Sequence, residues 1–480
     1  MKGQDDNFRQ LLETFNDFER EHNLFSITCG DVPVWERIRL PCFRHIIAEA
    51  GLFNQGQSEV DQDSLSNYLK GGYKWARGLV WKNPYFASPA DILFIGTARR
   101  KARKDGLMWD LFCDPILDSL DLDHVFVEPP YQFSHQRPAK TDHMRYLDAI
   151  TYTSVIQRKL GLANYEFTEA EAERIIELEN EMEHVFDCPI NLRGLVRDSL
   201  SERQSKKWLY DRLLDRIEPE IAVIVASAFW RTFIEVCQER DIPVVELQHG
   251  AGHHDHLGYS FPKDACISVF PDYMFVFGQF WKETVQYPIP KEAIYAVGYP
   301  YLEGERDRYS DTEKRKQVVF SSQWTIGEEL SKCALAFSEL DTGYDVVYNL
   351  HPKEYDSWRE EYPWLVDSPI EVIDGDIPPM YQILSESRVH VGVYSTVIYE
   401  GLCFGLDTFL LKVPGVSRMQ ALVDSGYVTT VSSATDLAKQ IETPASRSIL
   451  TTFSSRMLLT TSRTRSTRYC QIECRIDGRV

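Results

Sequence analysis

The sequence has no excess of basic residues and no long apolar run. Its 480 residues include 52 Lys and Arg against 72 Asp and Glu, a net charge of −20. Because binding to nucleic acid needs a basic field that neutralises phosphates, this balance argues against a nucleic-acid partner. The most apolar stretch, Ile221 to Trp230, ends at Arg231. It is about half as long as the ~20 residues that a membrane span requires.

Closely spaced cysteine pairs are also missing. The ten cysteines are scattered without a CxxC pair, and the nearest two are Cys470 and Cys474. A secreted disulfide scaffold would be shorter and denser in cysteine. The first residues, Met1 to Asp6, lack the basic start and apolar core of a signal peptide. These features predict reduced thiols and a cytoplasmic protein.

The chain is long enough for two or three domains. Apolar side chains from Phe8 to Phe25 recur at helical spacing and predict a helical extension over residues 1–87. From Asp91 onward, short apolar strands alternate with polar loops and helical stretches, the pattern of buried parallel strands in an α/β layer. We therefore predict an α/β fold class with two Rossmann-like, doubly wound domains at residues 88–265 and 266–440, and a basic tail at residues 441–480.

The predicted strands are short runs rich in Val and Ile. The predicted tail differs in charge from the acidic remainder of the chain, because residues 446–480 hold seven Arg against Glu473 and Asp477, a local charge of +5. It predicts a disordered end or a weak peripheral anchor to anionic lipid. The first domain has predicted strands at 91–95, 124–127, 221–226 and 242–247, and the second has them at 273–277, 294–297, 318–320, 345–349, 370–373, 389–393 and 408–411.

The loop that follows the strand at 242–247 is rich in histidine. Ligands of doubly wound sheets bind beyond the carboxyl ends of strands, and this strand runs directly into Gln248, His249 and Gly250. An imidazole at such a position can act as a general base. We expect His249 to be catalytic, with Gln248, Gly250 and His253 as acceptor or loop contacts. The alternatives are a metal site, which these spacings do not favour, and histidines that only form hydrogen bonds.

Two polar motifs follow strands of the second domain. Pro352 restricts His351 to an extended backbone, and His351 with Lys353 suits a phosphate oxygen. Ser395 and Thr396 cap a helix whose amides favour an anion. Further candidates for ligand contacts, Ser321 with Ser322 and Thr97 with Arg99, follow two other predicted strands. The full set of expected donor-site residues is His351, Lys353, Ser395, Thr396, Glu400, Ser321 and Ser322, and Thr97 and Arg99 are further acceptor candidates in the first domain.

Taken together, these motifs resemble those of a known group, the GT-B glycosyltransferases of surface and capsular polysaccharide synthesis. The resemblance rests on two α/β blocks, on a Gln-His-Gly loop that closes the first block, and on His-Pro and Ser-Thr-x-x-x-Glu-Gly motifs in the other. Polysialyltransferases, capsule sugar transferases and teichoic-acid glycerophosphotransferases share the pattern. The resemblance implies two Rossmann-like domains facing a cleft. It also implies inverting transfer from a nucleotide-activated sugar, or glycerol phosphate, to a glycan or lipid-linked acceptor, without a metal or other cofactor.

The resemblance also assigns roles to residues. His351 would contact the donor phosphate, Ser395 and Thr396 would hold phosphate at the helix start, and Glu400 would contact the ribose. His249 matches the base of the glycerophosphotransferases. The acidic pair followed by Gly that polysialyltransferases use has no match, which argues against sialic acid as the donor. A UDP-sugar 2-epimerase and a non-catalytic nucleotide- or glycan-binding protein are the alternatives.

Overall fold

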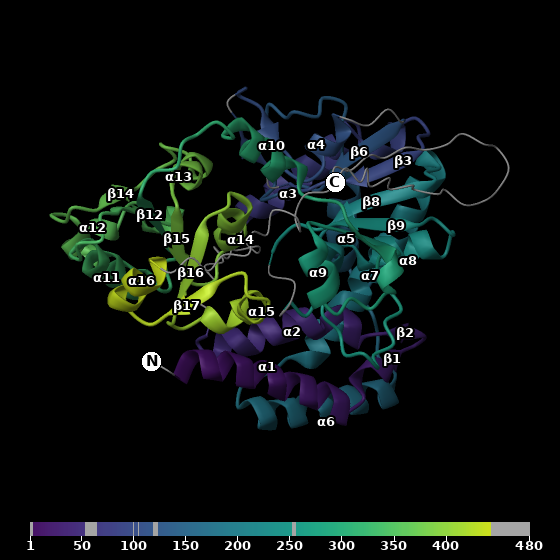
Figure 1. Cartoon of the computed structure of the whole chain (residues 1–480). Coiled ribbons are helices and arrows are strands. Elements are labelled where there is room, and N and C mark those ends of the chain that lie inside the picture. Colours follow the sequence, from purple (N-terminus) through teal and green to yellow (C-terminus); the bar gives the residue numbers. More distant parts are fainter. Residues whose placement is uncertain are drawn as a thin grey trace.

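The computed structural model describes residues 3–52, 65–98, 100–103, 105–118, 123–251 and 256–442. Within these residues two large parallel sheets, one of seven strands and one of six, form the centres of two α/β domains (Figure 1). The predicted fold class of two Rossmann-like α/β domains is confirmed. The predicted tail lies outside the described residues from residue 443 onward.

The first sheet has the strand order β11-β10-β9-β8-β3-β6-β7, and all neighbouring strands run parallel. On β3 (Ile92–Ile95), Leu93 and Ile95 enter a core on one face, while Ile92 and Phe94 enter a core on the other. Both faces of this strand are covered, which explains why its sequence is a continuous apolar run and does not alternate with polar residues. The strands are β3 (Ile92–Ile95), β6 (His124–Glu128), β7 (Arg145–Tyr146), β8 (Ile221–Val225), β9 (Val244–Leu247), β10 (Tyr273–Val276) and β11 (Ile294–Ala296).

This sheet extends past the predicted boundary between residues 265 and 266. Tyr273 of β10 pairs with Val245 of β9, and Met274 pairs with Ile294 of β11. The strands at 273–277 and 294–297, which we expected in the second domain, therefore complete the first, and that boundary is wrong. A strand's own sequence indicates its burial but not its neighbours, because pairing is decided by tertiary packing.

The second sheet has the order β14-β13-β12-β15-β16-β17 and is also parallel throughout. Val318 and Phe320 of β12 face one core, and Val319 faces the other. Helices cover each face, as the doubly wound prediction requires. The strands are β12 (Gln317–Ser321), β13 (Asp345–Asn349), β14 (Glu371–Ile373), β15 (Val389–Gly392), β16 (Asp407–Leu411) and β17 (Thr429–Val431).

The N-terminal helices pack on a helical part of the first domain instead of standing apart. α1 (Gly3–Glu21) and α2 (Trp35–Glu49) form one core with α6 (Glu169–Phe186) and the start of α7 (Leu192–Ile217) (Figure 1). α3 (Leu65–Gly78) lies against α5 (Asp148–Lys159). Two short antiparallel pairs complete the described strands: β1 (Thr28–Cys29) with β2 (Val32–Pro33) between α1 and α2, and β4 (Lys101–Ala102) with β5 (Met108–Trp109) between β3 and β6.

A helix and an apolar cluster join the two domains. α10 (Pro300–Arg308) contacts α4 (Asp114–Leu117) on one side and α13 (Met380–Glu386) on the other. One core cluster includes Trp281 from the first domain and Tyr399 and Leu402 from the second. The remaining helices are α8 (Arg231–Gln238), α9 (Gln279–Thr284), α11 (Gly327–Ser338), α12 (Trp358–Glu361), α14 (Thr396–Cys403), α15 (Gln420–Asp424) and α16 (Ala434–Ile441). Across the residues that the structure describes, no helix is both long and apolar enough to cross a membrane.

Candidate active site

His249 stands at the carboxyl end of β9, above a buried carboxylate of the same strand. Its Nδ1 lies 3.2 Å from the Tyr259 hydroxyl and 3.8 Å from Oε1 of Glu246. The Tyr259 hydroxyl donates its hydrogen to Oε1 of Glu246 over 2.5 Å. Glu246 is fully buried, whereas the His249 side chain is 31% exposed. The three groups therefore form a line that runs from the core to the surface.

The hydrogen bonds among Glu246, Tyr259 and His249 determine which nitrogen of His249 carries a proton. Because the single hydrogen of the Tyr259 hydroxyl goes to Glu246, the phenol oxygen accepts a hydrogen bond from Nδ1–H of His249. Burial and the charge of Glu246 raise the pKa of Tyr259 well above its ordinary value, so the phenol keeps its hydrogen. Nε2 of His249 is then the basic nitrogen. This is the setting that a general base for a hydroxyl proton requires.

The N-terminal helix α2 supports the loop that carries Tyr259. Nη1 of Arg39 donates to the carbonyl oxygens of Leu257 (2.8 Å) and Ser260 (2.9 Å), on either side of the tyrosine. The remaining nitrogens of Arg39 bind both oxygens of Glu19 in α1 at 2.7 Å. Arg39 and Glu19 are essentially unexposed. The N-terminal helices α1 and α2 therefore support the loop that carries Tyr259 through this buried ion pair.

Gln248 anchors the His249 loop instead of presenting a free amide. It is 1% exposed. Its Oε1 accepts from the Phe277 amide (2.8 Å), and its Nε2 donates to the Gly250 carbonyl (2.7 Å). The oxygen and the nitrogen of the side-chain amide thus both bond within the protein. Gln248 therefore positions the loop instead of making the expected contact with an acceptor. Gly250 has no atom within 4 Å of a built Cβ, so packing does not require glycine there.

The other histidines of the loop do not form a metal site in the described part of the chain. Nδ1 of His256 accepts a hydrogen bond from the Gly258 amide at 3.1 Å. Burial lowers the pKa of His256 to about 4, so this ring is neutral near pH 7. His253 lies outside the described residues. Among those that are described, no group of three or more His, Cys, Asp or Glu side chains could hold a metal ion.

His351, at the carboxyl end of β13, has the opposite hydrogen-bond setting to His249. Its Nδ1 accepts from the Lys353 amide (3.2 Å), while its own amide donates to Oε2 of Glu354 (2.7 Å). In a neutral ring whose Nδ1 is an acceptor, Nε2 must carry the hydrogen. Burial lowers the pKa of His351, which favours the neutral form. His351 therefore presents an N–H donor, which suits a phosphate oxygen. Lys353 is exposed, and its Nζ lies 4.7 Å from the ring centroid of Trp324.

Ser321 and Ser322, expected to contact the donor, have internal partners instead. Ser321 is 2% exposed, and its hydroxyl lies 2.9 Å from Nε2 of His390. Ser322 is 6% exposed and donates to Oε1 of Glu354 at 2.9 Å. Their predicted role is corrected, because both hydroxyls stabilise the strand ends beneath the site. Glu354, which sequence reasoning missed, joins Ser322 to His351.

The start of α14 forms as predicted. Ser395 is the N-cap, and its hydroxyl accepts from the Val397 amide at 3.3 Å. Thr396, the first helical residue, is exposed. The fully buried ring of His390 lies beneath this helix, since a Cβ at Gly401 would meet Nδ1 of His390 at 2.5 Å. Gly401 therefore lets the helix pack closely on β15.

Glu400 lies one turn into α14 and faces the first domain. It is half-buried, and its Oε1 accepts from the Tyr381 hydroxyl at 3.3 Å. Burial raises the pKa of Glu400, and the charge of Lys101, on β4 of the other domain, partly opposes this. The Tyr299 hydroxyl is also close enough to be influenced by Glu400. Groups of both domains thus converge on this carboxylate.

Thr97, at the carboxyl end of β3, is held by a carboxylate. Its amide and its hydroxyl donate to Oδ2 of Asp110 at 2.6 and 3.2 Å. Asp110 is fully buried, and sequence reasoning missed it as well as Glu246 and Tyr259. A single acid within an apolar strand, such as Glu246, is the signal that could have found one of them. Arg99 lies outside the described residues.

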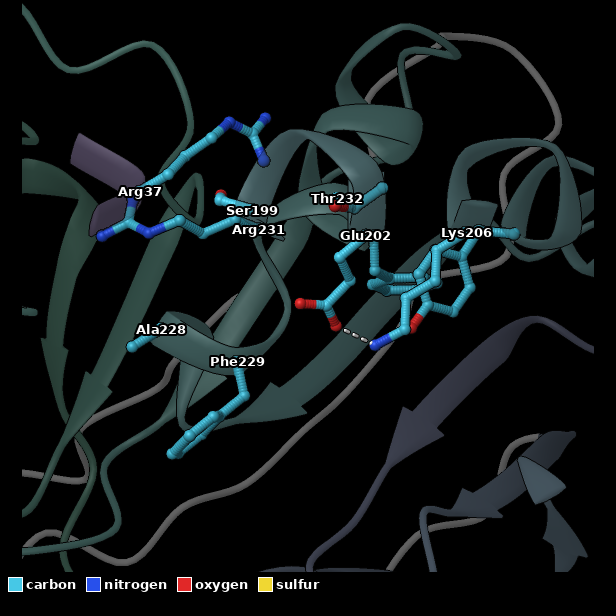
Figure 2. Close-up of a pocket in the computed structure, with 10 residues that line it drawn as sticks. Arg37, Ser199, Glu202, Lys206, Ala228, Phe229, Arg231 and Thr232 are labelled. Carbon is cyan, nitrogen blue, oxygen red and sulfur yellow. Dashed lines mark hydrogen bonds and ion pairs between the residues drawn. The ribbon is translucent and has the colours of Figure 1, made fainter. Parts of the chain in front are cut away.

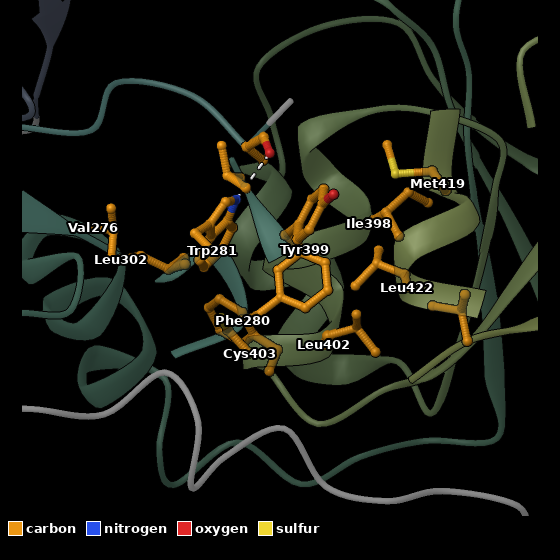
Figure 3. Packing of buried hydrophobic residues seen from close by; sticks show 14 of the residues in the cluster. Val276, Phe280, Trp281, Leu302, Ile398, Tyr399, Leu402, Cys403, Met419 and Leu422 are labelled. Atoms are coloured by element: carbon orange, nitrogen blue, oxygen red, sulfur yellow. Dashed lines mark hydrogen bonds between the residues drawn. The ribbon is translucent and has the colours of Figure 1, made fainter. Parts of the chain in front are cut away.

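Aromatic side chains connect the loop that carries His249 to helix α14 of the second domain. Nε1 of Trp281 in α9 donates to the carbonyl oxygen of Ala251 at 2.9 Å, which fixes the loop after His249. The Trp281 ring lies 5.4 Å from the ring of Tyr399, the neighbour of Glu400 on α14 (Figure 3). One aromatic pair therefore connects the His249 loop of the first domain to the helix that begins at Ser395 and Thr396.

No family model and no curated protein matches the sequence. Solved structures with a similar fold include UDP-GlcNAc 2-epimerase of Methanocaldococcus jannaschii in complex with UDP-GlcNAc and UDP (10% identity, TM-score 0.39, 80% of this chain and 95% of that one). They also include the calicheamicin glycosyltransferase CalG4 (12%, 0.41, 75% and 91%) and the wall teichoic acid polymerase TagF (10%, 0.36, 79% and 88%). A likeness at this distance assigns no activity, so a functional assignment depends on the chemistry at the strand ends.

Proposed function

We propose that the protein is a metal-independent glycosyltransferase that moves a sugar, or glycerol phosphate, from a nucleotide-activated donor to a glycan or lipid-linked acceptor. One observation carries the proposal, namely the opposite settings of two imidazoles. Nδ1 of His249 faces the Tyr259 oxygen, which leaves Nε2 basic, whereas Nδ1 of His351 accepts from Lys353, which makes Nε2 a donor. Transfer from a nucleotide needs both, a base for the acceptor and a donor for the leaving phosphate.

The donor would lie against the second domain. Nε2–H of His351, the ammonium of Lys353 and the amides at the start of α14 would bind its phosphate oxygens. Glu400 would accept hydrogen bonds from the ribose hydroxyls. The negative charge that develops on the leaving phosphate would then be stabilised by these donors, which are in place before the reaction begins.

The acceptor hydroxyl would lie against the first domain. Nε2 of His249 would take the hydroxyl proton while the oxygen forms a bond to the anomeric carbon and the bond to the phosphate breaks. With glycerol phosphate as the transferred group, the new bond forms to phosphorus instead. The imidazolium that results keeps its Nδ1–H on the Tyr259 oxygen, above the Glu246 carboxylate. A single displacement of this kind inverts the anomeric centre.

The proposal is tested with the purified protein and nucleotides. We expect nucleoside mono- or diphosphates to raise the melting temperature, since a ligand that binds the native state stabilises it. A preference for CMP would point to glycerol phosphate or sialic acid as the transferred group, and a preference for UDP or GDP to common hexoses. A nucleotide sugar that is converted to its epimer without any acceptor would contradict glycosyl transfer and support an epimerase. Absence of any nucleotide effect would contradict both enzymes.

A further inference from the structure

A small polar pocket with a cavity volume of about 80 Å³, partly open to solvent, lies beside the carboxyl end of β8. Its walls come from α2, α7, the turn Ser227–Phe229 and the first turn of α8 (Figure 2). We call it the basic pocket. The lining residues that matter for its chemistry are Arg37, Glu202, Lys206, Phe229, Arg231 and Thr232.

Cationic side chains outnumber carboxylates on its walls. Arg37, Lys206 and Arg231 face a single acid, Glu202. Glu202 forms an ion pair with Lys206, and in Figure 2 the two arginines lie on the other side of Glu202 from this lysine. Lys206 is therefore neutralised by Glu202. Arg37 pairs with Glu235, but Arg203 and Lys207 share that carboxylate, so positive charge is in excess around the pocket in a chain whose net charge is −20.

Neither guanidinium is fully satisfied within the protein. The Arg37 side chain is 4% exposed and pairs with Glu235 through Nη2, but its buried Nε has no hydrogen-bond partner among the described residues. Arg231 is 8% exposed and donates to the Val269 carbonyl oxygen at 3.0 Å. No carboxylate in the described part of the chain forms an ion pair with Arg231. Burial lowers the pKa of Arg231 to about 10; the charge of Glu36 opposes this shift and that of Arg37 adds to it. An anion would relieve both groups.

The remaining walls suit a sugar ring. The Glu202 side chain is 44% exposed, so its carboxylate can still accept hydrogen bonds from hydroxyl groups. The Thr232 hydroxyl can donate or accept. Phe229 is 68% exposed and offers an apolar ring to the C–H face of a sugar. An anionic group beside a polyhydroxyl ring matches this combination of charge, hydroxyl acceptors and an aromatic face.

The basic pocket adjoins the His249 site. Ala228, which lines it, lies 3.5 Å from a Cβ built on Gly258. Gly258 directly precedes Tyr259, whose hydroxyl contacts both Glu246 and His249. The charge of Arg231 is also influenced by Tyr259. The pocket is thus connected to the His249 site through Ala228, Gly258 and Tyr259.

We propose that the basic pocket binds an anionic sugar unit of the acceptor, one that carries a carboxylate or a phosphate. Its assignment to the acceptor rests on the proposed glycosyl transfer, whereas the binding itself does not. Arg37 and Arg231 bind the anion, Glu202 and Thr232 bind ring hydroxyls, and Phe229 packs on the ring. This would make the acceptor an acidic or phosphorylated glycan and would hold it on the same side of the molecule as His249.

The test uses three probes with the same ring, namely glucuronate, glucose 6-phosphate and glucose. Their binding to the full-length protein is measured by ligand-observed NMR and calorimetry, without any donor. We expect at least one anionic probe to bind and glucose not to bind, and which anion binds more tightly identifies the source of the charge.

Two variants and one control locate the binding in the pocket. In Arg37→Gln and Lys206→Gln the affinity for the anionic probe should fall by roughly tenfold or more. The first change removes a cation that binds the anion, and the second leaves the charge of Glu202 without its counterion beside the anion. Lys332→Gln is the control, because this exposed lysine pairs with Glu328 on α11 of the second domain, away from the pocket.

Arg37 also pairs with Glu235, so its variant can fail to fold, and Lys206→Gln then decides. The proposal is overturned if no probe binds, if glucose binds as tightly as the anionic sugars, or if Lys332→Gln weakens binding as much as Lys206→Gln does. Nucleotide-induced stabilisation is measured on the same samples. If it is absent while binding of the anionic probe still depends on Lys206, then the proposed transfer fails and the binding site stands.

Discussion

The guanidinium of Arg39 donates a 2.8 Å hydrogen bond to the carbonyl oxygen of Leu257, a residue 218 positions further along the chain. This bond joins the N-terminal helices to the loop that carries Tyr259. The loop therefore depends on Glu19, which holds the other nitrogens of Arg39. The helices before residue 88, which the sequence showed only as a peripheral extension, are part of the structural support of the first site.

Glu19→Gln is expected to lower the free energy of unfolding by about 3–5 kcal/mol, because it leaves the buried Arg39 without its countercharge. Glu13→Gln on the same helix is the control. Its pair with Arg9 is mostly exposed, at 66% and 61% of the side chains, and its loss should cost less than about 1 kcal/mol. Urea denaturation of both variants measures the difference. Equal, small losses would contradict a structural role for the Arg39 pair.

His249→Asn is expected to lower the rate of transfer by about 10²–10⁴-fold, the usual contribution of a general base, while nucleotide binding is retained. Tyr259→Phe should lower it by a smaller factor, because Nε2 is still present but Nδ1 has lost the oxygen that orients the ring. Rates are measured with saturating donor. His124→Asn, at the amino end of β6, is the control. Loss of nucleotide binding in His249→Asn would refute the assignment of this residue to the acceptor side.

His351→Asn separates the structural role of this residue from its role in binding. Asparagine is a good N-cap, so its side-chain oxygen can still accept from the Lys353 amide and the fold should be preserved. The N–H donor that Nε2 would offer to the donor phosphate in the proposed reaction is lost. A hydrogen bond to a charged group contributes about 1.5–3 kcal/mol, so nucleotide affinity should fall roughly 10- to 150-fold. Calorimetric titration checks this, and an unchanged affinity would exclude His351 from the phosphate site.

Glu400→Gln is expected to weaken nucleotide binding but to stabilise the protein at neutral pH. Burial raises the pKa of Glu400, so the folded state binds this proton more tightly than the unfolded state does. The stability that this provides is present at low pH and is lost as the pH rises through the raised pKa, above which the buried charge is unfavourable. Glutamine carries no charge at any pH.

Melting temperatures from pH 4 to pH 8 test this expectation. The variant should be more stable than the wild type at pH 7 to 8, and the difference should shrink toward pH 4. Glu328→Gln, on an exposed side chain that pairs with Lys332, should show no comparable trend. A difference in favour of the wild type at pH 8 would mean that Glu400 is stabilised as a carboxylate.

Gly401→Ala is expected to destabilise the second domain by about 1–3 kcal/mol, the usual range for overpacking. The new Cβ would lie 2.5 Å from Nδ1 of His390, a fully buried ring. Gly304→Ala is the matched control, since this glycine also lies in a helix but has nothing within 4 Å of a built Cβ. That change should be neutral or stabilising by up to about 1 kcal/mol. Similar effects at both positions would contradict close packing of α14 on His390.

The strands and the polar loops after them were readable from the sequence, since both follow local patterns. Apolar runs such as Ile221–Val225 indicate buried parallel strands, and a Ser followed by a helical pattern indicates the cap at Ser395. The order of the strands was not readable. β10 and β11 resemble the strands of either domain, and their place in the first sheet depends on the surfaces that they cover.

The sequence by itself determined which residue types stand at the strand ends, including His249, His351 and Glu400. Only the tertiary structure decided their chemistry, because a proton's position depends on partners that are distant or unremarkable in the sequence. Glu246 and Tyr259 orient His249, the Lys353 amide orients His351, and Ser321 and Ser322 have their hydroxyls occupied by His390 and Glu354. A local pattern specifies a side chain and its backbone, whereas burial and hydrogen bonding across the fold specify what that side chain can do.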